Sequence, residues 1–211
     1  MMWSRKKKNR SDVNEIDSKC RGCEKTFNEV TFDECEPLLK ILTERQIDFV
    51  IFGGFAVFLQ MIKFNQEVQD IFDVESGTRI TEDIDVLSKS VQFIIEVLKE
   101  ESKTGIILDS NYIQEGLTKI EDGEDGMTVF LNNKRGIDIL SCIQGYSIED
   151  MEYDIVEYRG YSLKIATVET LMDMKTKLIE TYGDGARDKD KSDLGLLGLM
   201  FEKKNEGGLK W

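Results

Sequence analysis

The sequence has no histidine, only one proline and no long apolar run among its 211 residues. The lack of histidine excludes Ser-His and Cys-His nucleophile pairs, histidine general bases and zinc sites that contain histidine. Chemistry at any active site must therefore use carboxylates, lysine, arginine, tyrosine, serine or cysteine. Since no stretch of about 18 apolar residues occurs, we expect no transmembrane helix, and we expect a cytoplasmic protein that does not contact a membrane.

Cysteine is also scarce. Two of the four cysteines, Cys20 and Cys23, form a CxxC pair, whereas Cys35 and Cys142 are scattered. A zinc site would need all four thiolates, and their spacing is not that of a zinc ribbon or finger. Reduced thiols of a cytosolic protein are the favoured interpretation, and the sequence leaves open whether the Cys20/Cys23 pair binds a metal.

Basic residues are outnumbered, because 28 Lys and Arg stand against 41 Asp and Glu and give a formal net charge of −13 at pH 7. This balance argues against broad nucleic-acid binding, since phosphate backbones are attracted by basic surfaces. Residues 1–10 are the exception and carry Arg5, Lys6, Lys7, Lys8 and Arg10. No apolar segment follows them, so we expect a solvated tail rather than a secretory signal, although such a tail can also contact RNA or an acidic partner.

Apolar periodicity predicts three parts: a flexible, polar N-terminal segment at 1–30, an α/β domain at 31–166, and a C-terminal helical part at 167–211 that packs on it. Pro37 is expected in the first turn of the first helix, and Ser88 and Thr167 are expected to cap later helices. The fold class is therefore α/β (α+β), with a mixed sheet flanked by helices and followed by a helical hairpin. The patterns predict helices at 33–46, 55–62, 91–101, 168–182 and 188–203, and strands at 48–52, 83–87, 105–120, 127–131, 137–141, 153–158 and 161–165.

Carboxylates occur inside two of the predicted strands. Asp83 and Asp85 are two residues apart, so their side chains point to the same face of a strand, whereas Ile84 points to the core. A second strand contains Asp138, which joins the pair if the two strands are neighbours. Three carboxylates in one place repel one another unless a cation lies among them, and all-oxygen ligation suits Mg²⁺ or Mn²⁺. Phosphoryl or nucleotidyl transfer is the leading interpretation.

The aspartates and a preceding glycine pair occur in a recognisable order along the chain. A strand and Gly53-Gly54 come first, Arg79-x-Thr81-x-Asp83-x-Asp85 follows, and a third aspartate, Asp138, lies on a later strand. This pattern resembles the nucleotidyltransferase superfamily of the DNA polymerase beta type, in particular the branch of minimal nucleotidyltransferases and abortive-infection toxins. The stretch 187–194, with its Arg-x-Lys-Asp-x-x-Asp-Leu pattern, is similar to the start of a C-terminal helix in that branch. The resemblance covers about residues 38–200.

The resemblance implies a role for each residue. Asp83 and Asp85 would hold Mg²⁺, and Asp138 would help to bind a second metal and activate the attacking hydroxyl group. Gly53 and Gly54 would let the backbone approach the triphosphate. Arg79 would neutralise a phosphate or pair with Asp85, and Lys175 would reach the β- or γ-phosphate from the helical part. For Arg187, Asp190 and Asp193, we favour a buried charge network that ties the last two helices to the sheet.

Two function classes remain open. The first is a Mg²⁺-dependent nucleotidyltransferase that moves NMP from an NTP such as ATP to a hydroxyl of RNA, a protein or a small molecule. A toxin–antitoxin role with an antitoxin or other protein partner follows only by analogy. The second is a catalytically inactive protein of the same fold that acts as a regulatory or interaction module. The intact set of three aspartates favours the enzyme, because an inactive copy need not keep carboxylates that repel one another. The longer separation between Gly54 and Asp83 predicts an inserted segment at 63–78.

Overall fold

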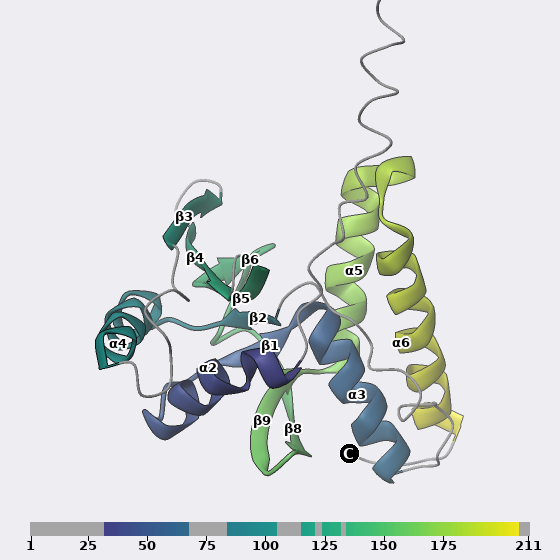
Figure 1. The fold of residues 1–211 in the computed structure, drawn as a ribbon. Coiled ribbons are helices and arrows are strands. Elements are labelled where there is room, and N and C mark those ends of the chain that lie inside the picture. The colour runs from purple at the N-terminus through teal and green to yellow at the C-terminus, as the bar shows by residue number, and fades with distance from the viewer. Residues whose placement is uncertain (1–31, 68–83, 105–114, 121–123, 132–133, 207–211) are drawn as a thin grey trace, which may run out of the picture.

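The computed structural model describes residues 32–67, 84–104, 115–120, 124–131 and 134–206 (Figure 1). The α-helices are α2 (Phe32–Glu44), α3 (Gly53–Glu67), α4 (Val91–Thr104), α5 (Val168–Tyr182) and α6 (Asp188–Glu206), and a 3₁₀ turn spans Gly183–Gly185. The strands are β1 (Val50–Phe52), β2 (Ile84–Leu87), β3 (Glu115–Ile120), β4 (Glu124–Leu131), β5 (Lys134–Leu140), β6 (Cys142–Ile143), β7 (Tyr146–Ser147), β8 (Tyr153–Tyr158) and β9 (Tyr161–Ala166).

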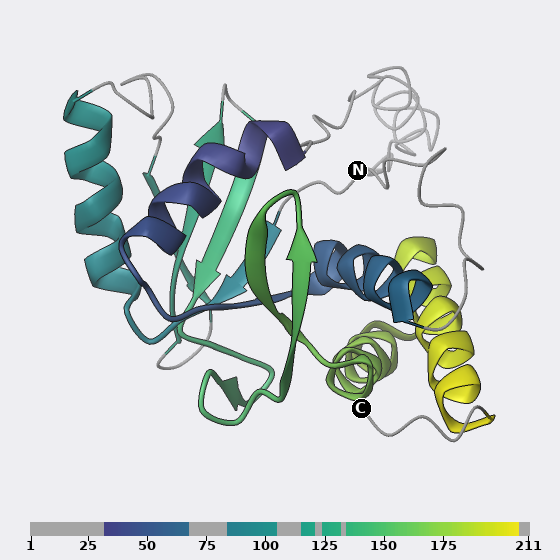
Figure 2. The same ribbon diagram turned by 90° about the horizontal axis from the view of Figure 1, so that it is seen from below.

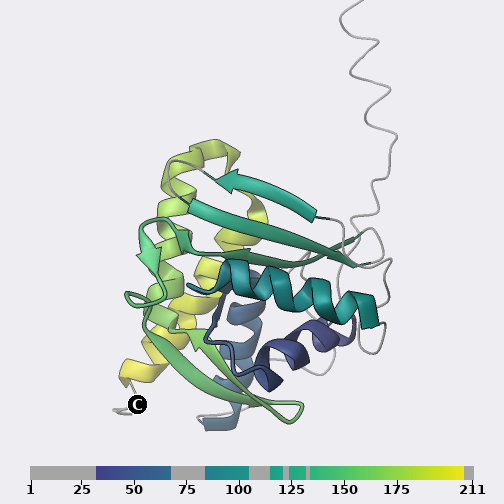
Figure 3. The same ribbon diagram turned by 90° about the vertical axis from the view of Figure 1, so that its left-hand side faces the viewer.

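Seven of these strands form one mixed sheet in the order β3-β4-β5-β2-β1-β9-β8. The two central contacts of β2 differ in direction: β2 is antiparallel to β1 and parallel to β5. Strand β1 is in turn parallel to β9. Strands β6 and β7 form a separate two-stranded ribbon. In Figure 3, β3 and β4 run across the molecule above α4.

The helices form two groups. Helices α2 and α4 lie together beside the sheet, whereas α3, α5 and α6 lie together at the side of the molecule away from α4 (Figures 1 and 2). One apolar core joins the sheet to both groups, and its most deeply buried side chains include Leu39 of α2, Leu59 of α3 and Leu197 of α6. The mixed α/β architecture with a C-terminal helical hairpin, predicted from the sequence, is confirmed.

Local signals explain several boundaries. Thr167 caps α5 as predicted, because its Oγ1 accepts a hydrogen bond from the amide of Thr170 at 3.2 Å. The turn between β8 and β9 also falls where expected, with positive φ angles of 50° at Arg159 and 84° at Gly160. This pair of left-handed residues matches the right-handed twist of a two-residue hairpin.

Two predicted details were wrong. Pro37 is the sixth residue of α2 rather than part of its first turn. Ser88 lies three residues before α4, is fully buried, and donates through its Oγ to the carbonyl oxygen of Asp48 at 2.7 Å. The helix predicted at 55–62 spans Gly53–Glu67 as α3 and begins at the glycine pair, because the chain turns into the helix directly at the end of β1. Among helices of the described residues, none has both the length and the apolar character needed to cross a membrane.

Leu197 and Leu199 form a matched pair on α6 for testing the core. Leu197 is completely buried, whereas Leu199 is 52% exposed. Replacing Leu197 by alanine should lower the free energy of unfolding by about 2–5 kcal/mol, because a cavity is added to the lost apolar burial. Leu199→Ala should cost less than about 1 kcal/mol. Urea denaturation followed by circular dichroism measures both, and equal losses would show that α6 does not pack in this orientation.

Candidate active site

Two carboxylates lie side by side in the centre of the sheet. Strands β2 and β5 are parallel and in register, so Asp85 is directly opposite Asp138. Neighbouring strands lie about 4.8 Å apart, and residues opposite each other project from the same face. The alternate residues Ile84 and Ile137 are 1% exposed and belong to the core. The sequence prediction that separate strands bring two of the three aspartates together is thus met for Asp85 and Asp138.

Gly53 passes unusually close to this pair. A Cβ atom at Gly53 would lie 2.0 Å from Oδ2 of Asp85, well inside any permitted contact. Gly53 also has a φ angle of +70°, which favours glycine. The turn from β1 into α3 therefore lies against the Asp85 carboxylate, and only glycine fits there. Helix α3 starts at this residue, so its first backbone N–H groups and the positive end of its dipole lie beside the carboxylate.

Asp83 and Arg79 lie outside the described residues, and so does most of the predicted insert at 63–78. Within the described part of the chain, no group of three or more Cys, Asp and Glu side chains is placed to hold a metal ion. The donor set that is present, two adjacent carboxylates beside a glycine turn, nevertheless fits a hard cation that takes oxygen ligands, such as Mg²⁺ or Mn²⁺.

Lys175 is held in a buried charge network between α5 and α6. Its Nζ lies 2.6 Å from Oδ1 of Asp190 and 2.9 Å from Oδ2 of Asp193. Asp190 also accepts hydrogen bonds from Arg187, at 2.8 Å from Nε and 3.2 Å from a terminal nitrogen. Both aspartate side chains are almost completely buried, whereas the Arg187 side chain is 60% exposed. The predicted network of Arg187, Asp190 and Asp193 is confirmed, and it joins α5 to α6 through Lys175. The predicted link of these helices to the sheet through the network stays a prediction.

The network sets the charge on this wall of the site. Burial lowers the pKa of Lys175, and the hydrogen bond and charge of Asp190 and the charge of Asp85 act in the opposite direction. Burial would raise the pKa of Asp190, but hydrogen bonds from Arg187 and Lys175 outweigh it and leave that pKa below its ordinary value. Asp190 is therefore held ionised, and Lys175 feels the charge of Asp85 across the site.

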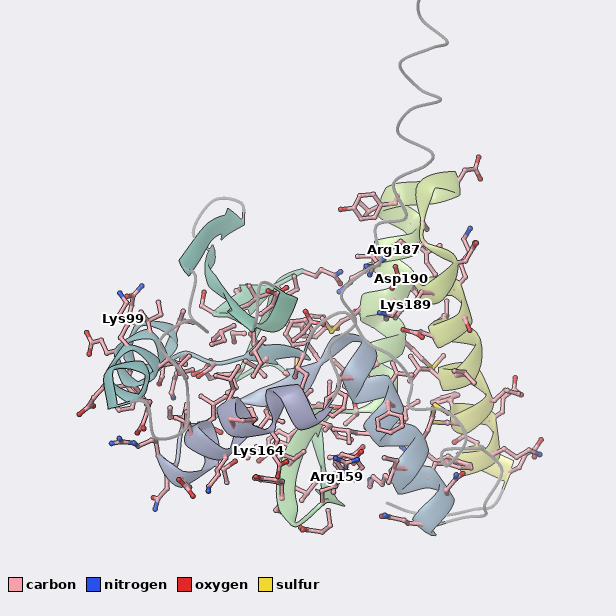
Figure 4. All side chains as sticks on the ribbon, in the orientation of Figure 1. Lys99, Arg159, Lys164, Arg187, Lys189 and Asp190 are labelled. Atoms are coloured by element: carbon pink, nitrogen blue, oxygen red, sulfur yellow. The ribbon has the colours of Figure 1, made fainter. Side chains whose placement is uncertain are left out.

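A cavity of about 160 Å³ separates the network from the sheet. One face of α5 supplies an apolar wall, from residues at helical spacing of three and four. Positive charge comes from Lys175, Arg187 and Lys189, and Figure 4 shows Arg187, Lys189 and Asp190 together near the start of α6. The full lining is Phe52, Gly53, Gly54, Asp85, Ile143, Gln144, Leu171, Met174, Lys175, Leu178, Arg187 and Lys189.

The structure thus brings Gly53, Gly54, Asp85 and Lys175 into one cavity and places Asp138 next to Asp85. Sequence reasoning missed the contribution of the β6–β7 ribbon, which adds Ile143 and Gln144. Each of its strands has two residues, which is too short for alternation to reveal. The Gln-Gly dipeptide at 144–145, a weak form of the Asn-Gly hairpin signal, was the available clue.

The arrangement of elements matches that of several solved structures. A lincomycin-bound lincosamide antibiotic adenylyltransferase, LnuA, superimposes with a TM-score of 0.52 and 14% identity, covering 82% of this chain and 99% of that chain. The Megavirus polyadenylate synthase gives a TM-score of 0.57 and 15% identity over 95% of this chain and 40% of that chain. The antibiotic-resistance factor ANT(2'')-Ia gives a TM-score of 0.51 and 16% identity over 82% of this chain and 86% of that chain.

This chain has a nucleotidyltransferase fold. The resemblance predicted from the glycine pair and the aspartates is confirmed at the level of the fold. No protein-family model matches the sequence, and no curated protein matches it. Within the nucleotidyltransferase fold, the cavity lies between the aspartate-bearing strands and the C-terminal helices.

Substituting alanine for Gly53 should displace the Asp85 carboxylate. Gly160→Ala is the matched control, because Gly160 also has a positive φ but an added Cβ there meets nothing within 4 Å. Both variants should lose about 1–2 kcal/mol of stability from the left-handed conformation. Only Gly53→Ala should also bind Mn²⁺ more weakly, as measured by paramagnetic titration. Equal Mn²⁺ affinities in the two variants would contradict a cation site at Asp85.

Asp190→Asn tests the charge network. The change leaves two cations short of a carboxylate and should destabilise the chain by about 3–5 kcal/mol near neutral pH. Since the folded pKa of Asp190 is depressed, its contribution is present above the ordinary value of 3.8 and is lost as the pH falls through the folded pKa. The variant should therefore lose less stability on acidification than the wild type. Asp188→Asn, at an exposed position on the same helix, should change neither quantity in urea titrations across pH.

Proposed function

We propose that this protein is a divalent-cation-dependent nucleotidyltransferase that moves NMP from a nucleoside triphosphate to a hydroxyl group. The observation that carries the proposal is the in-register pair Asp85 and Asp138 beside the Gly53 turn, with Asp85 facing a cavity whose opposite wall carries Lys175, Arg187 and Lys189. Neutral ligands would gain little from such a division of charge. A polyphosphate chain with a bound cation matches both walls.

Asp85 and Asp138, with Asp83, would hold Mg²⁺ or Mn²⁺, which when bound neutralises the triphosphate and the developing negative charge. The protein itself supplies the rest of the binding. The backbone at Gly53 and Gly54 lies close enough to meet phosphate oxygens through N–H groups. Lys175 and Arg187 add positive charge from the helical wall, and the carboxylate of Asp190 fixes their positions. Arg79, predicted to neutralise a phosphate, remains a candidate for the same role.

We assign to Asp138 the role of taking the proton from the hydroxyl group of the acceptor. In the transfer, a bond forms between the acceptor oxygen and the α-phosphorus, and the bond from the α-phosphorus to the bridging oxygen breaks. Pyrophosphate leaves, and the NMP stays on the acceptor. The hydroxyl proton goes to Asp138, which lies next to Asp85 but is not part of the cavity lining on the Lys175 side.

We further propose ATP as the donor, because two proteins of like fold are named for adenylyl or adenylate transfer. The acceptor is a smaller hydroxyl compound rather than a long RNA, since a net charge of −13 opposes binding of a polyanion. The lincosamide adenylyltransferase, whose length this chain spans almost fully, was solved with the small molecule lincomycin. A toxin–antitoxin role, an antitoxin partner and a cytoplasmic location stay predictions.

The test is transfer of label from [α-³²P]ATP in Mg²⁺ to a panel of hydroxyl compounds, RNA and proteins. Asp138→Asn should lower the transfer rate by at least about 100-fold, because a general base typically contributes that much. Asp85→Asn should lower both transfer and Mg²⁺-dependent ATP binding. Asp48→Asn is the control, since this exposed carboxylate lies before β1 at the opposite end of the strand and pairs with Lys164.

An unchanged transfer rate in Asp85→Asn or Asp138→Asn would overturn the site assignment. If the wild type binds no nucleotide in Mg²⁺, the catalytically inactive interaction module becomes the better description. Thermal melting with and without ATP separates that case from the absence of a suitable acceptor, because a competent site is stabilised by its nucleotide even when no acceptor is present.

A further inference from the structure

The turn between β6 and β7, which we call the rim turn (Ile143–Tyr146), places a polar side chain at the edge of the cavity. Gln144 and Gly145 form the turn and have φ angles of 51° and 83°. Asparagine followed by glycine is the preferred pair for this geometry, because asparagine tolerates the left-handed region better than other residues. Gln144 is therefore not the residue that the turn alone would favour.

The rim turn is anchored to α5. The hydroxyl of Tyr146 donates to Oδ2 of Asp173 at 2.5 Å, and this hydrogen bond raises the pKa of Tyr146. Lys177 pairs with the same carboxylate at 2.7 Å and lies over the Tyr146 ring at 4.7 Å from its centroid. Because Leu171, Met174 and Lys175 line the cavity from the same helix, Gln144 is held at a fixed position relative to that wall.

Gln144 differs in chemistry from the rest of the cavity lining. The other lining residues described above are glycine, apolar or charged, so its carboxamide is the one neutral polar side chain among them. Its Oε1 is shielded from solvent and accepts no hydrogen bond within the described residues. A buried oxygen without a partner has lost its hydration without compensation. A ligand that offers a hydrogen-bond donor would supply the missing hydrogen bond.

We propose that Gln144 determines donor specificity by reading the edge of the nucleobase, and this rests on the proposed function. A carboxamide forms two hydrogen bonds with adenine, accepting from N6–H and donating to N7. The terminal torsion of glutamine is broad, so the amide can turn to present both atoms. Guanine presents two acceptors at this edge, O6 and N7, so the carboxamide could donate to one of them but Oε1 would stay without a partner. Apolar contact with the base comes from Ile143, Met174 and Leu178.

The test measures binding of the α,β-methylene analogues of ATP and GTP, and of inorganic tripolyphosphate, by calorimetry in Mg²⁺. Gln144→Asn gives the turn its preferred residue but shortens the amide by one methylene, and Gln144→Met keeps the length without the hydrogen bonds. Both should weaken binding of the ATP analogue by about tenfold or more and leave GTP-analogue and tripolyphosphate binding unchanged. Arg159→Ala, in the β8–β9 turn of the same conformation, should bind all three as the wild type does.

The outcomes separate this inference from the function on which it rests. Wild-type affinity for the ATP analogue in Gln144→Asn would show that the residue serves only the turn and would overturn the proposal. An equal loss for tripolyphosphate would also overturn it, because the base would not be what Gln144 reads. If the wild-type protein binds none of the three compounds, the proposed function itself fails, and with it this inference.

Discussion

The parallel pairing of β2 with β5 is the constraint on which the candidate site depends. It fixes Asp85 opposite Asp138, so two like charges lie on one row of the sheet and cannot move apart without breaking the register. Such a pair is unfavourable on its own. The helix N-terminus at Gly53 and the cationic wall across the cavity partly compensate the negative charge of the pair.

Ion pairs fix the charged side chains of that wall. Asp190 binds Lys175 and Arg187 at once, and Asp193 adds a second contact to Lys175. Buried ion pairs contribute little net stability, because desolvation offsets their attraction. Their value here is geometric: two long, flexible cationic side chains are kept in place on one side of the cavity. The negative and positive walls are thus built independently, one by strand register and one by contacts between helices.

The amino-acid sequence was sufficient for the features that depend on short repeating patterns. Strand alternation directed Asp85 away from the core residue Ile84, and the hypothesis that its strand is a neighbour of the strand with Asp138 is confirmed by the β2–β5 register. The Thr167 cap located the start of α5. It was insufficient where tertiary contacts decide. Ser88 does not cap α4. Its buried Oγ donates to the carbonyl oxygen of Asp48, a residue far away in the sequence that tertiary packing brings close. The role of Lys175 within the ion-pair network and the placement of Gln144 depend on how α5 packs, which no local pattern contains.

The anchoring of the rim turn through Tyr146 has a mechanical consequence. Helices α5 and α6 and the β6–β7 ribbon are connected by polar contacts, while Gly53 lies against Asp85 of the sheet. Any widening or narrowing of the cavity would then displace these helices and the ribbon relative to the sheet. The apolar core that they share would resist this, as would the covalent junctions of the ribbon with β5 and β8 and of α5 with β9. A molecule that contacts both the sheet and the C-terminal helices would restrict their relative movement without changing the shape of either.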